Sequence, residues 1–466
     1  MSQVCRDVLS RPVQTVRCGW RVTPVALAFL LGALLLANVA QAQVGLFRGS
    51  AVGGVAIDAE GVLRQPAVAD LRAVREQVLQ AAQPVPEGLS RFSPSRKISL
   101  RRLEQALVVA ASQPGEPIPD DIRYLAGLQR IEAIVVDTDA HDILLVGPAD
   151  GWTLDERSVM VGQHNGLPTL LLDDLLVAFR SMREAASGNI TCSIDPTPAG
   201  LQAVQNLLRR QKTFQPAVIR AIEEAMGPQQ ITVQGIPSDS HFARVMVGAD
   251  YRMKRIAMNL EPAPIAQLPG FLDLVASKRG KLSTMTPRWW MACNYQTLLR
   301  DQAGLTWQLQ GQGVKVMTEA DVLGNNGQVQ HTGKRDPLAQ QWADLMTQHF
   351  EALATADPLF GQVRNLMDLC VATALIEKEG LLERAALELP MLRDAQSSLA
   401  VEQWPAPKTV ATQGSFVRQR GTVLITASGG VDIDFAAVLQ KVEQSPQLEQ
   451  FGKQSRTAAP PSWAWD

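Results

Sequence analysis

The chain has 466 residues, of which 46% are hydrophobic and 19% are charged, and its formal net charge is −2. This length and composition allow a large buried core, which excludes an intrinsically disordered protein. The slight acidic excess lacks the concentrated basic surface that nucleic-acid binding requires, so we expect no nucleic-acid partner.

The N-terminal segment predicts export. Four arginines precede an apolar run at 25–37, and the small-residue pattern Ala40-Gln41-Ala42 follows it. This order is typical of a secretory signal peptide with cleavage between Ala42 and Gln43, which predicts a soluble protein of the periplasm or the extracellular space. An uncleaved anchor is the alternative, but the run is short for a membrane span, and no later segment is apolar enough for one. Cleavage removes four arginines and one aspartate and leaves a net charge of −5.

Three cysteines remain after the predicted cleavage, namely Cys192, Cys293 and Cys370. An odd number permits one disulfide at most, and the sequence leaves the pairing open. Cys370 lies on the apolar face of a predicted helix, where we expect a buried free thiol.

Short strands and helices alternate over residues 43–188, which we predict to form an N-terminal α+β domain. Segment 52–63 has the pattern of a β-hairpin, and Gly61 can supply the positive φ that its turn needs. The remaining pattern predicts helices at 67–82, 99–112, 120–128 and 169–186, and strands at 131–136, 143–146 and 158–161.

Residues 189–404 predict a second α+β domain with a long central helix at 238–260. Its other expected helices are 198–211, 216–226, 271–277, 336–354 and 359–376, and strands are expected at 190–195 and 230–234. Four strands at 288–291, 295–299, 305–309 and 314–317 have the spacing of an antiparallel meander. Residues 405–466 predict a hairpin at 415–432, a short helix at 435–443 and a flexible tail.

The central helix has the strongest pattern in the chain. Phe242, Met246, Met253 and Ile256 recur on one face with helical spacing, which predicts an amphipathic helix packed on the core. Ser238 or Asp239 is expected to cap its start, and Pro262 to end it. The opposite stripe contains Arg244, Gly248, Tyr251 and Arg255, and Asp250 and Lys254 have the i,i+4 spacing of a surface ion pair. The glycine in this stripe indicates a close approach to the helix backbone.

Familiar catalytic and metal-binding patterns are missing. The chain has no G-x-S-x-G elbow, and nothing local pairs Cys293 with His241 or His331. The five histidines are scattered without metal-ligand spacing, and the acidic turn at 137–142 lacks the glycine and glutamate of a calcium loop. We therefore expect no cofactor and no metal site, and catalytic residues stay unassigned.

Arginine and tryptophan residues give the candidate binding surface. Arg288 and Trp289 open a predicted strand, and Arg252 and Arg255 lie on the central helix. Both residue types are enriched at binding hot spots because they desolvate a large flat surface and still donate hydrogen bonds. The competing interpretation is that Trp289 and Trp290 alternate between core and rim, and that the arginines form a solvated face.

Several sequence blocks resemble, in order, those of a domain-of-unknown-function family of exported bacterial proteins. The blocks are GGVAIDAEGVL, SLRRLEQAL, YLAGLQRIE, LVGPADGW, SIDPTPAGL, GADYRMKRIAM, PRWW and VRNLMDL, over about residues 53–375. The resemblance implies export and a shared fold, but it carries no catalytic residue to this chain.

Two functions of different classes follow. The first is a non-enzymatic binding or scaffold protein of the cell envelope, which contacts a macromolecule through the Arg/Trp surface and through the terminal segment 460–465. The alternative is an extracytoplasmic hydrolase with a polar cleft lined by Asp250, Tyr251 and Arg252. A buried Asp250 with a raised pKa in a closed pocket would favour the enzyme, and an exposed Asp250 paired with Lys254 would favour the binding protein.

Overall fold

A nine-stranded mixed sheet is the larger of the two main sheets in the computed structural model. The structure describes residues 55–58, 60–66, 68–113, 116–182, 189–210, 217–278, 287–323, 329–331, 333, 335–417, 422–424, 428–456 and 462–466. The predicted signal peptide and its cleavage site at Ala42 and Gln43 lie outside these residues. In spatial order the strands are β1 (Ala56–Ile57), β2 (Val62–Arg64), β15 (Thr409–Val410), β9 (Gln229–Gln234), β8 (Ile190–Asp195), β18 (Ser428–Ile433), β10 (Pro287–Asn294), β13 (Gly313–Leu323) and β14 (Val329–His331).

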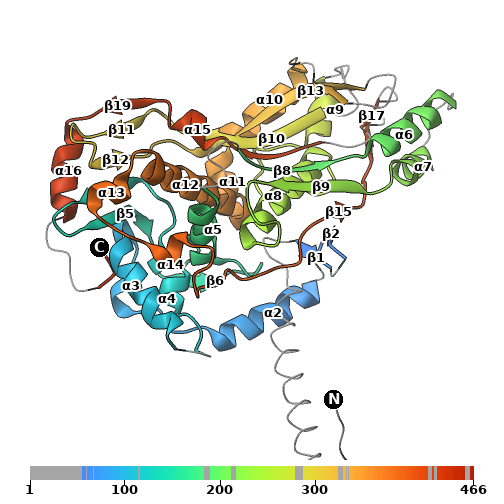
Figure 1. The fold of residues 1–466 in the computed structure, drawn as a ribbon. Helices are drawn as coiled ribbons and strands as arrows, with labels where there is room; N and C mark the ends of the chain where they lie inside the picture. The colour runs from blue at the N-terminus through green and yellow to red at the C-terminus, as the bar shows by residue number, and fades with distance from the viewer. Residues whose placement is uncertain are drawn as a thin grey trace, which may run out of the picture. The chain divides into compact units, whose positions relative to one another are not determined.

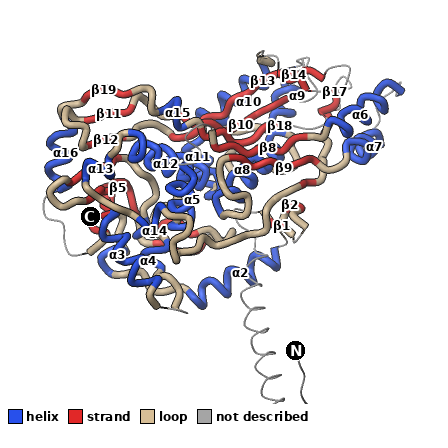
Figure 2. The backbone as a smooth tube through the Cα atoms, in the orientation of Figure 1, coloured by secondary structure: helices blue, strands red, loops and turns tan. Residues whose placement is uncertain are grey.

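A seven-stranded sheet forms the second main layer (Figure 2). Its strands, in spatial order, are β19 (Val442–Gln444), β11 (Leu298–Arg300), β12 (Thr306–Gln308), β4 (Ala133–Asp137), β5 (Asp142–Ala149), β3 (Ser93–Ser99) and β20 (Ala464–Trp465). Two hairpins stand apart from both sheets: β6 (Trp152–Leu154) with β7 (Met160–Gly162), and β16 (Ser415–Val417) with β17 (Thr422–Leu424).

Three helices, α5 (Leu172–Met182), α8 (His241–Ala257) and α12 (Pro358–Lys378), lie between the two sheets (Figure 1). The other helices are α2 (Val68–Ala81), α3 (Leu100–Ala111), α4 (Asp120–Arg123), α6 (Pro198–Arg210), α7 (Ala217–Met226), α9 (Phe271–Lys278), α10 (Pro337–Gln348), α11 (Phe350–Ala356), α13 (Leu381–Ala385), α14 (Pro390–Arg393), α15 (Phe435–Val438) and α16 (Gln447–Arg456), with 3-10 turns η1 (Glu87–Leu89) and η2 (Leu125–Gly127). Among the described helices, α12 alone is long and apolar enough to cross a membrane, and its apolar stretch is completely buried in the protein. It is therefore placed as a core helix. The α+β class predicted from the sequence is confirmed.

Helix α8 occupies the predicted central position and has the predicted amphipathic pattern, but no face of it is exposed to solvent. Its N-cap is Ser240, whose Oγ accepts a hydrogen bond from the Ala243 amide at 3.1 Å, rather than Ser238 or Asp239. Every residue of the helix except Arg252 is buried. The predicted core face is confirmed, but the opposite stripe is buried as well, because other elements cover it. At Gly248 an added Cβ would lie 3.1 Å from a methyl group of Val55, which confirms the predicted close approach.

The strands at 287–323 do not form the predicted meander. β10 pairs directly with β13 in the larger sheet, whereas β11 and β12 pair with each other in the smaller one. The predicted boundaries near residues 188 and 404 also do not separate structural domains, because each main sheet takes strands from all three predicted segments. Residues 48–466 form one compact unit. The end of the predicted flexible tail is likewise corrected, since residues 464–465 form strand β20.

Candidate functional site

Trp289 is a core residue rather than part of a binding surface. Its side chain is completely buried between Phe271 of α9 and Trp342 of α10, with ring centroids at 4.9 Å and 5.0 Å. Its indole Nε1 donates a hydrogen bond to the Ala339 carbonyl at 3.2 Å. The alternation along β10 leaves Trp290 half-buried, so the competing core-and-rim interpretation holds for this pair.

The arginines of the predicted surface do not form a free face. Arg252 forms ion pairs with Asp357 at 2.5 Å and with Glu261 at 3.4 Å, and Arg255 binds Glu261 at 2.9 Å. Arg157 reaches the same Asp357 carboxylate at 2.5 Å. These residues tie α8 to the N-terminus of α12 and to the β6–β7 turn, which is a structural role.

Arg288 lies apart from this network, on β10. Its guanidinium lies over the ring of Trp290, 5.2 Å from the centroid. The four residues of the predicted binding surface therefore do not come together as one exposed patch.

The predicted cleft of Asp250, Tyr251 and Arg252 is also not formed. Successive residues of a helix point in directions about 100° apart, and these three side chains diverge. Asp250 points toward strands β8 and β18, where its Oδ2 binds Lys254 Nζ at 2.8 Å. Burial raises the pKa of Asp250 to about 6. The raised pKa matches the enzyme hypothesis, but the carboxylate is packed between a helix and a sheet.

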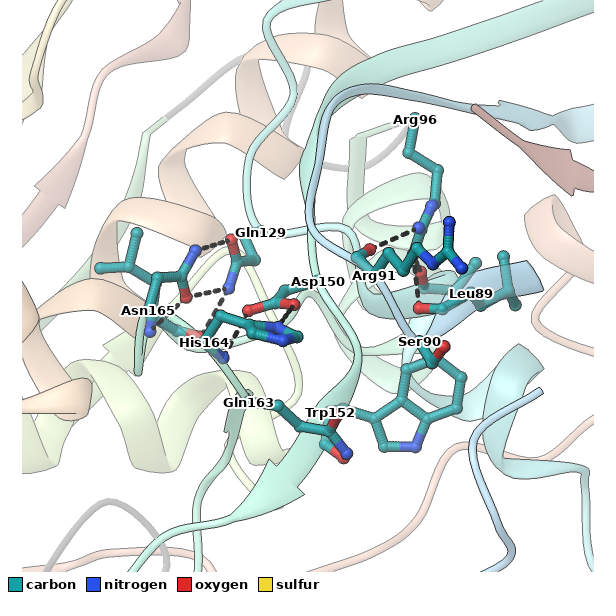
Figure 3. Close-up of polar contacts among 12 residues, drawn as sticks. Leu89, Ser90, Arg91, Arg96, Gln129, Asp150, Trp152, Gln163, His164 and Asn165 are labelled. Atoms are coloured by element: carbon teal, nitrogen blue, oxygen red, sulfur yellow. Dashed lines mark hydrogen bonds and ion pairs between the residues drawn. The ribbon is translucent and has the colours of Figure 1, made fainter. Parts of the chain in front are cut away.

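A different polar pair, Asp150 and His164, forms the candidate site (Figure 3). His164 Nδ1 lies 2.6 Å from Asp150 Oδ1, and the backbone amide of His164 donates to Asp150 Oδ2 at 2.8 Å. The Asp150 side chain is completely buried, whereas 60% of the His164 side chain is exposed. An ionised carboxylate only accepts hydrogen bonds, so the proton of the neutral imidazole lies on Nδ1. Nε2 is thereby left as an acceptor for a group outside the protein.

Gln129 and Asn165 hold the loop that carries His164. Each side-chain amide donates to the oxygen of the other, both at 2.8 Å, and Gln129 also donates to the Leu167 carbonyl at 3.0 Å. Gly162 lies next to these side chains. A Cβ at this position would collide with the side chains of Gln129, Asn165 and Asp150. A glycine at 162 is therefore required for these polar groups to meet.

A strained turn at residues 125–127 contacts the backbone of Asp150. Leu125 and Ala126 have φ of 45° and 52°, in the left-handed region that non-glycine residues rarely adopt, and Gly127 follows with φ 74°. The Gly127 carbonyl accepts a hydrogen bond from the Asp150 amide at 3.1 Å. The Ala126 carbonyl accepts one from Arg96 at 2.7 Å. Backbone strain of this kind persists where the surrounding structure enforces it, and it is concentrated at functional sites.

The arrangement offers a fixed imidazole to a ligand. The described residues contain no group of three or more His, Cys, Asp or Glu side chains arranged to hold a metal ion. Ser90, labelled beside the site in Figure 3, donates its hydroxyl proton to the Glu87 carbonyl at 2.8 Å. The pair thus offers a ligand one hydrogen-bonding atom, Nε2 of His164. This nitrogen accepts a hydrogen bond when the ring is neutral and donates one when the ring is protonated.

In the sequence His164 is one of five scattered histidines, and its spacing does not distinguish it from the others. A usable signal was nevertheless present, because Gly147, Gly151, Gly162 and Gly166 cluster around Asp150 and His164. At Gly151 an added Cβ would lie 2.6 Å from the Ser90 carbonyl and 2.9 Å from Gln163 Oε1. Gly147, Gly151 and Gly162 thus permit close packing near the pair, whereas Gly166 has a positive φ of 68° with open space around it.

The chain is an α+β protein built on two sheets, with a buried helical layer and a preorganised Asp–His pair at a loop surface. Residues 192–271 match the model of a family described as "Protein of unknown function (DUF1598)". The expected domain of unknown function is thus confirmed, over a shorter range than 53–375. The matched segment runs from β8 to the start of α9 and contains Asp250, but not Asp150 or His164. No curated protein and no solved structure matches the chain.

Proposed function

We propose that this protein is an exported, non-enzymatic binding or scaffold protein of the cell envelope, and that it contacts its partner at His164. The arginine-rich, apolar and small-residue segments at 1–42 support export. One observation carries the choice of site: an imidazole that is 60% exposed is anchored to a completely buried carboxylate. Such anchoring fixes the ring before a partner arrives, which reduces the ordering cost of binding.

The proposal is tested by retention of envelope components on the immobilised mature protein. His164→Ala should weaken retention of a specific component by about tenfold or more, as truncation of an interface anchor does. His141→Ala is the matched control, because His141 is also exposed but its Nδ1 contacts the Ala385 carbonyl at 3.0 Å, away from Asp150. Equal retention by wild type, His164→Ala and His141→Ala would contradict a binding role for this site.

Export has its own test. N-terminal sequencing of the native protein should give Gln43 or a residue close to it, from material in the extracytoplasmic fraction. Intact Met1 on cytoplasmic protein would contradict the proposed location.

The 2.6 Å contact between His164 and Asp150 favours a second candidate, an extracytoplasmic hydrolase. In this function Nε2 accepts a proton from a water molecule that attacks the substrate, and Asp150 stabilises the resulting imidazolium. A panel of chromogenic ester and phosphate substrates tests this candidate. Any activity should fall at least about 100-fold in His164→Ala and in Asp150→Asn and stay unchanged in His141→Ala.

A further inference from the structure

The last residues of the chain form a strand on the open edge of β3. Ala464 pairs with Ile98 and Trp465 with Lys97 in antiparallel register. The Ser99 amide donates to the Trp463 carbonyl at 2.9 Å, which extends the pairing. The side of β3 opposite β5 is thus occupied by a strand of only two residues.

Arg96 provides a preformed carboxylate receptor beside this strand. Its side chain is completely buried, and its Nε binds Asp466 Oδ1 at 2.8 Å. Its Nη1 donates to the Leu89 carbonyl at 3.2 Å and the Ala126 carbonyl at 2.7 Å. Its Nη2 donates to the Arg91 carbonyl at 3.0 Å. Main-chain carbonyls therefore hold the guanidinium, and its Nε is directed at an acidic side chain.

An aromatic position precedes the carboxylate position. Trp465 packs with Phe451 against the outer face of the sheet, on Ala133, Val135, Leu144 and Val146. The Arg102 guanidinium lies over the Trp465 ring, 5.8 Å from its centroid, and Arg102 Nη1 donates to the Ser462 carbonyl at 2.7 Å. Main-chain pairing with β3, apolar packing of Trp465 and the ion pair between Asp466 and Arg96 thus hold this short strand together.

We propose that the edge of β3 from Arg96 to Ser99, together with Arg102 of α3, is a docking site for an extended segment of a partner polypeptide. The segment that fits carries an aromatic residue at the Trp465 position, followed by a carboxylate at the Asp466 position. Residues 462–466 fill the site in cis. This mode of binding is strand addition to a sheet edge, in which main-chain hydrogen bonds give affinity and pockets for side chains give specificity. The inference is independent of the function proposed for His164.

Covering an edge against aggregation needs only main-chain pairing or a charged residue. Such covering does not require the buried Arg96, whose guanidinium favours a segment with a carboxylate at the Asp466 position. A tethered segment also competes at an effective concentration of about millimolar, so a partner displaces it poorly while it is attached. Binding in trans should therefore emerge when the tail is removed.

The test compares the intact chain with a variant that ends at Pro461. The probe is a fluorescent peptide with the sequence of residues 460–466, PPSWAWD, amidated so that the Asp466 side chain supplies the carboxylate. Fluorescence anisotropy should show saturable binding to the truncated protein and at least about 100-fold weaker binding to the intact chain. Peptides with Asp466→Asn or Trp465→Ala should each bind at least about tenfold more weakly than the parent peptide.

A truncated protein with native circular dichroism and no peptide binding would overturn the proposal, as would equal binding by the intact and truncated chains. If truncation prevents folding, the full-length double variant Trp465→Ala, Asp466→Asn replaces it, because it keeps the strand and removes both anchors. The same peptide should then bind this variant more tightly than wild type. If the peptide binds the double variant no more tightly than it binds wild type, the proposal is also overturned.

Discussion

Asp250 and Lys254 form their ion pair inside the protein, 2.8 Å from Oδ2 to Nζ, with side chains that are 0% and 7% exposed. The lysine ammonium also donates to the carbonyls of Ile194 at 2.8 Å and Gly429 at 3.4 Å. A buried ammonium is tolerated when its donors are satisfied in this way. The pair links α8 to two neighbouring strands of the larger sheet, which a surface pair could not do.

The pH dependence of stability should reflect Asp250. Its pKa is raised to about 6, mainly because burial disfavours the carboxylate. Between about pH 4 and pH 6 the folded state therefore holds a proton that the unfolded state has released. The free energy of unfolding should fall as pH rises through this window. Urea unfolding at several pH values should show a smaller fall for Asp250→Asn than for wild type, and parallel pH profiles of the two proteins would contradict the assignment.

Arg252 should be a stability residue. Arg252→Ala leaves Arg157 as the ion-pair partner of the buried Asp357 carboxylate, so we expect a loss of about 1 to 3 kcal/mol. Arg220→Ala is the control, because its i,i+4 pair with Glu224 is 86% and 69% exposed and should contribute less than about 0.5 kcal/mol. Equal unfolding free energies for the two variants would show that the Arg157–Asp357–Arg252 network contributes little.

Trp289 and Trp290 should behave differently although they are neighbours. Trp289→Ala removes a completely buried ring from between α9 and α10 and should cost about 3 to 5 kcal/mol. The half-buried Trp290 should cost clearly less when changed to Ala, because less apolar area is lost. Thermal unfolding of both variants checks this order, and the reverse order would mean that β10 presents its other face to the helices.

Gly162 should tolerate no side chain. Gly162→Ala places a methyl group among Gln129, Asn165 and Asp150, and overpacking of this kind costs about 1 to 3 kcal/mol. A Cβ added at Gly88 would point into open space with no contact within 4 Å, so Gly88→Ala should stay within about 0.5 kcal/mol of wild type. Melting temperatures that fall equally in both variants would argue against a specific requirement at position 162.

Cys192, Cys293 and Cys370 should react slowly with thiol reagents in the folded protein. All three are free, Cys192 and Cys370 are buried, and burial raises the pKa of each thiol, including the half-buried Cys293. The thiolate is the reactive form, so both access and ionisation are restricted. Labelling of protein that lacks residues 1–42, and with them Cys5 and Cys18, should count three thiols after unfolding and few before it. Fewer than three thiols in unreduced, unfolded protein would indicate a disulfide.

Local sequence patterns predicted the elements well. The turn at Gly61, with φ 85°, depends on residues adjacent in the sequence. The core face of α8 followed from helical spacing. These features are set within a few residues, so periodicity and turn patterns are enough to predict them.

Sheet membership and burial could not be predicted in the same way. Met291 of β10 pairs with Val431 of β18, and nothing in either segment specifies that partner. The same limit explains why the far stripe of α8 was expected to be solvated, since charged residues are buried only when distant groups satisfy them. The Asp150–His164 pair was missed for another reason: both residues are in loops, where spacing carries little geometric information.

Strand β18 lies in the middle of the larger sheet, between β8 and β10, although it comes from the last part of the chain. Until residues 428–433 arrive, β8 and β10 each have an unsatisfied edge, and Lys254 lacks the Gly429 carbonyl that lies 175 positions further along. Contacts of such long sequence separation slow folding, because the loop-closure entropy is paid before the pairing is gained. The larger sheet can therefore close only after residues 428–433 have been made, and until then β8 and β10 leave two open edges for a chaperone to shield.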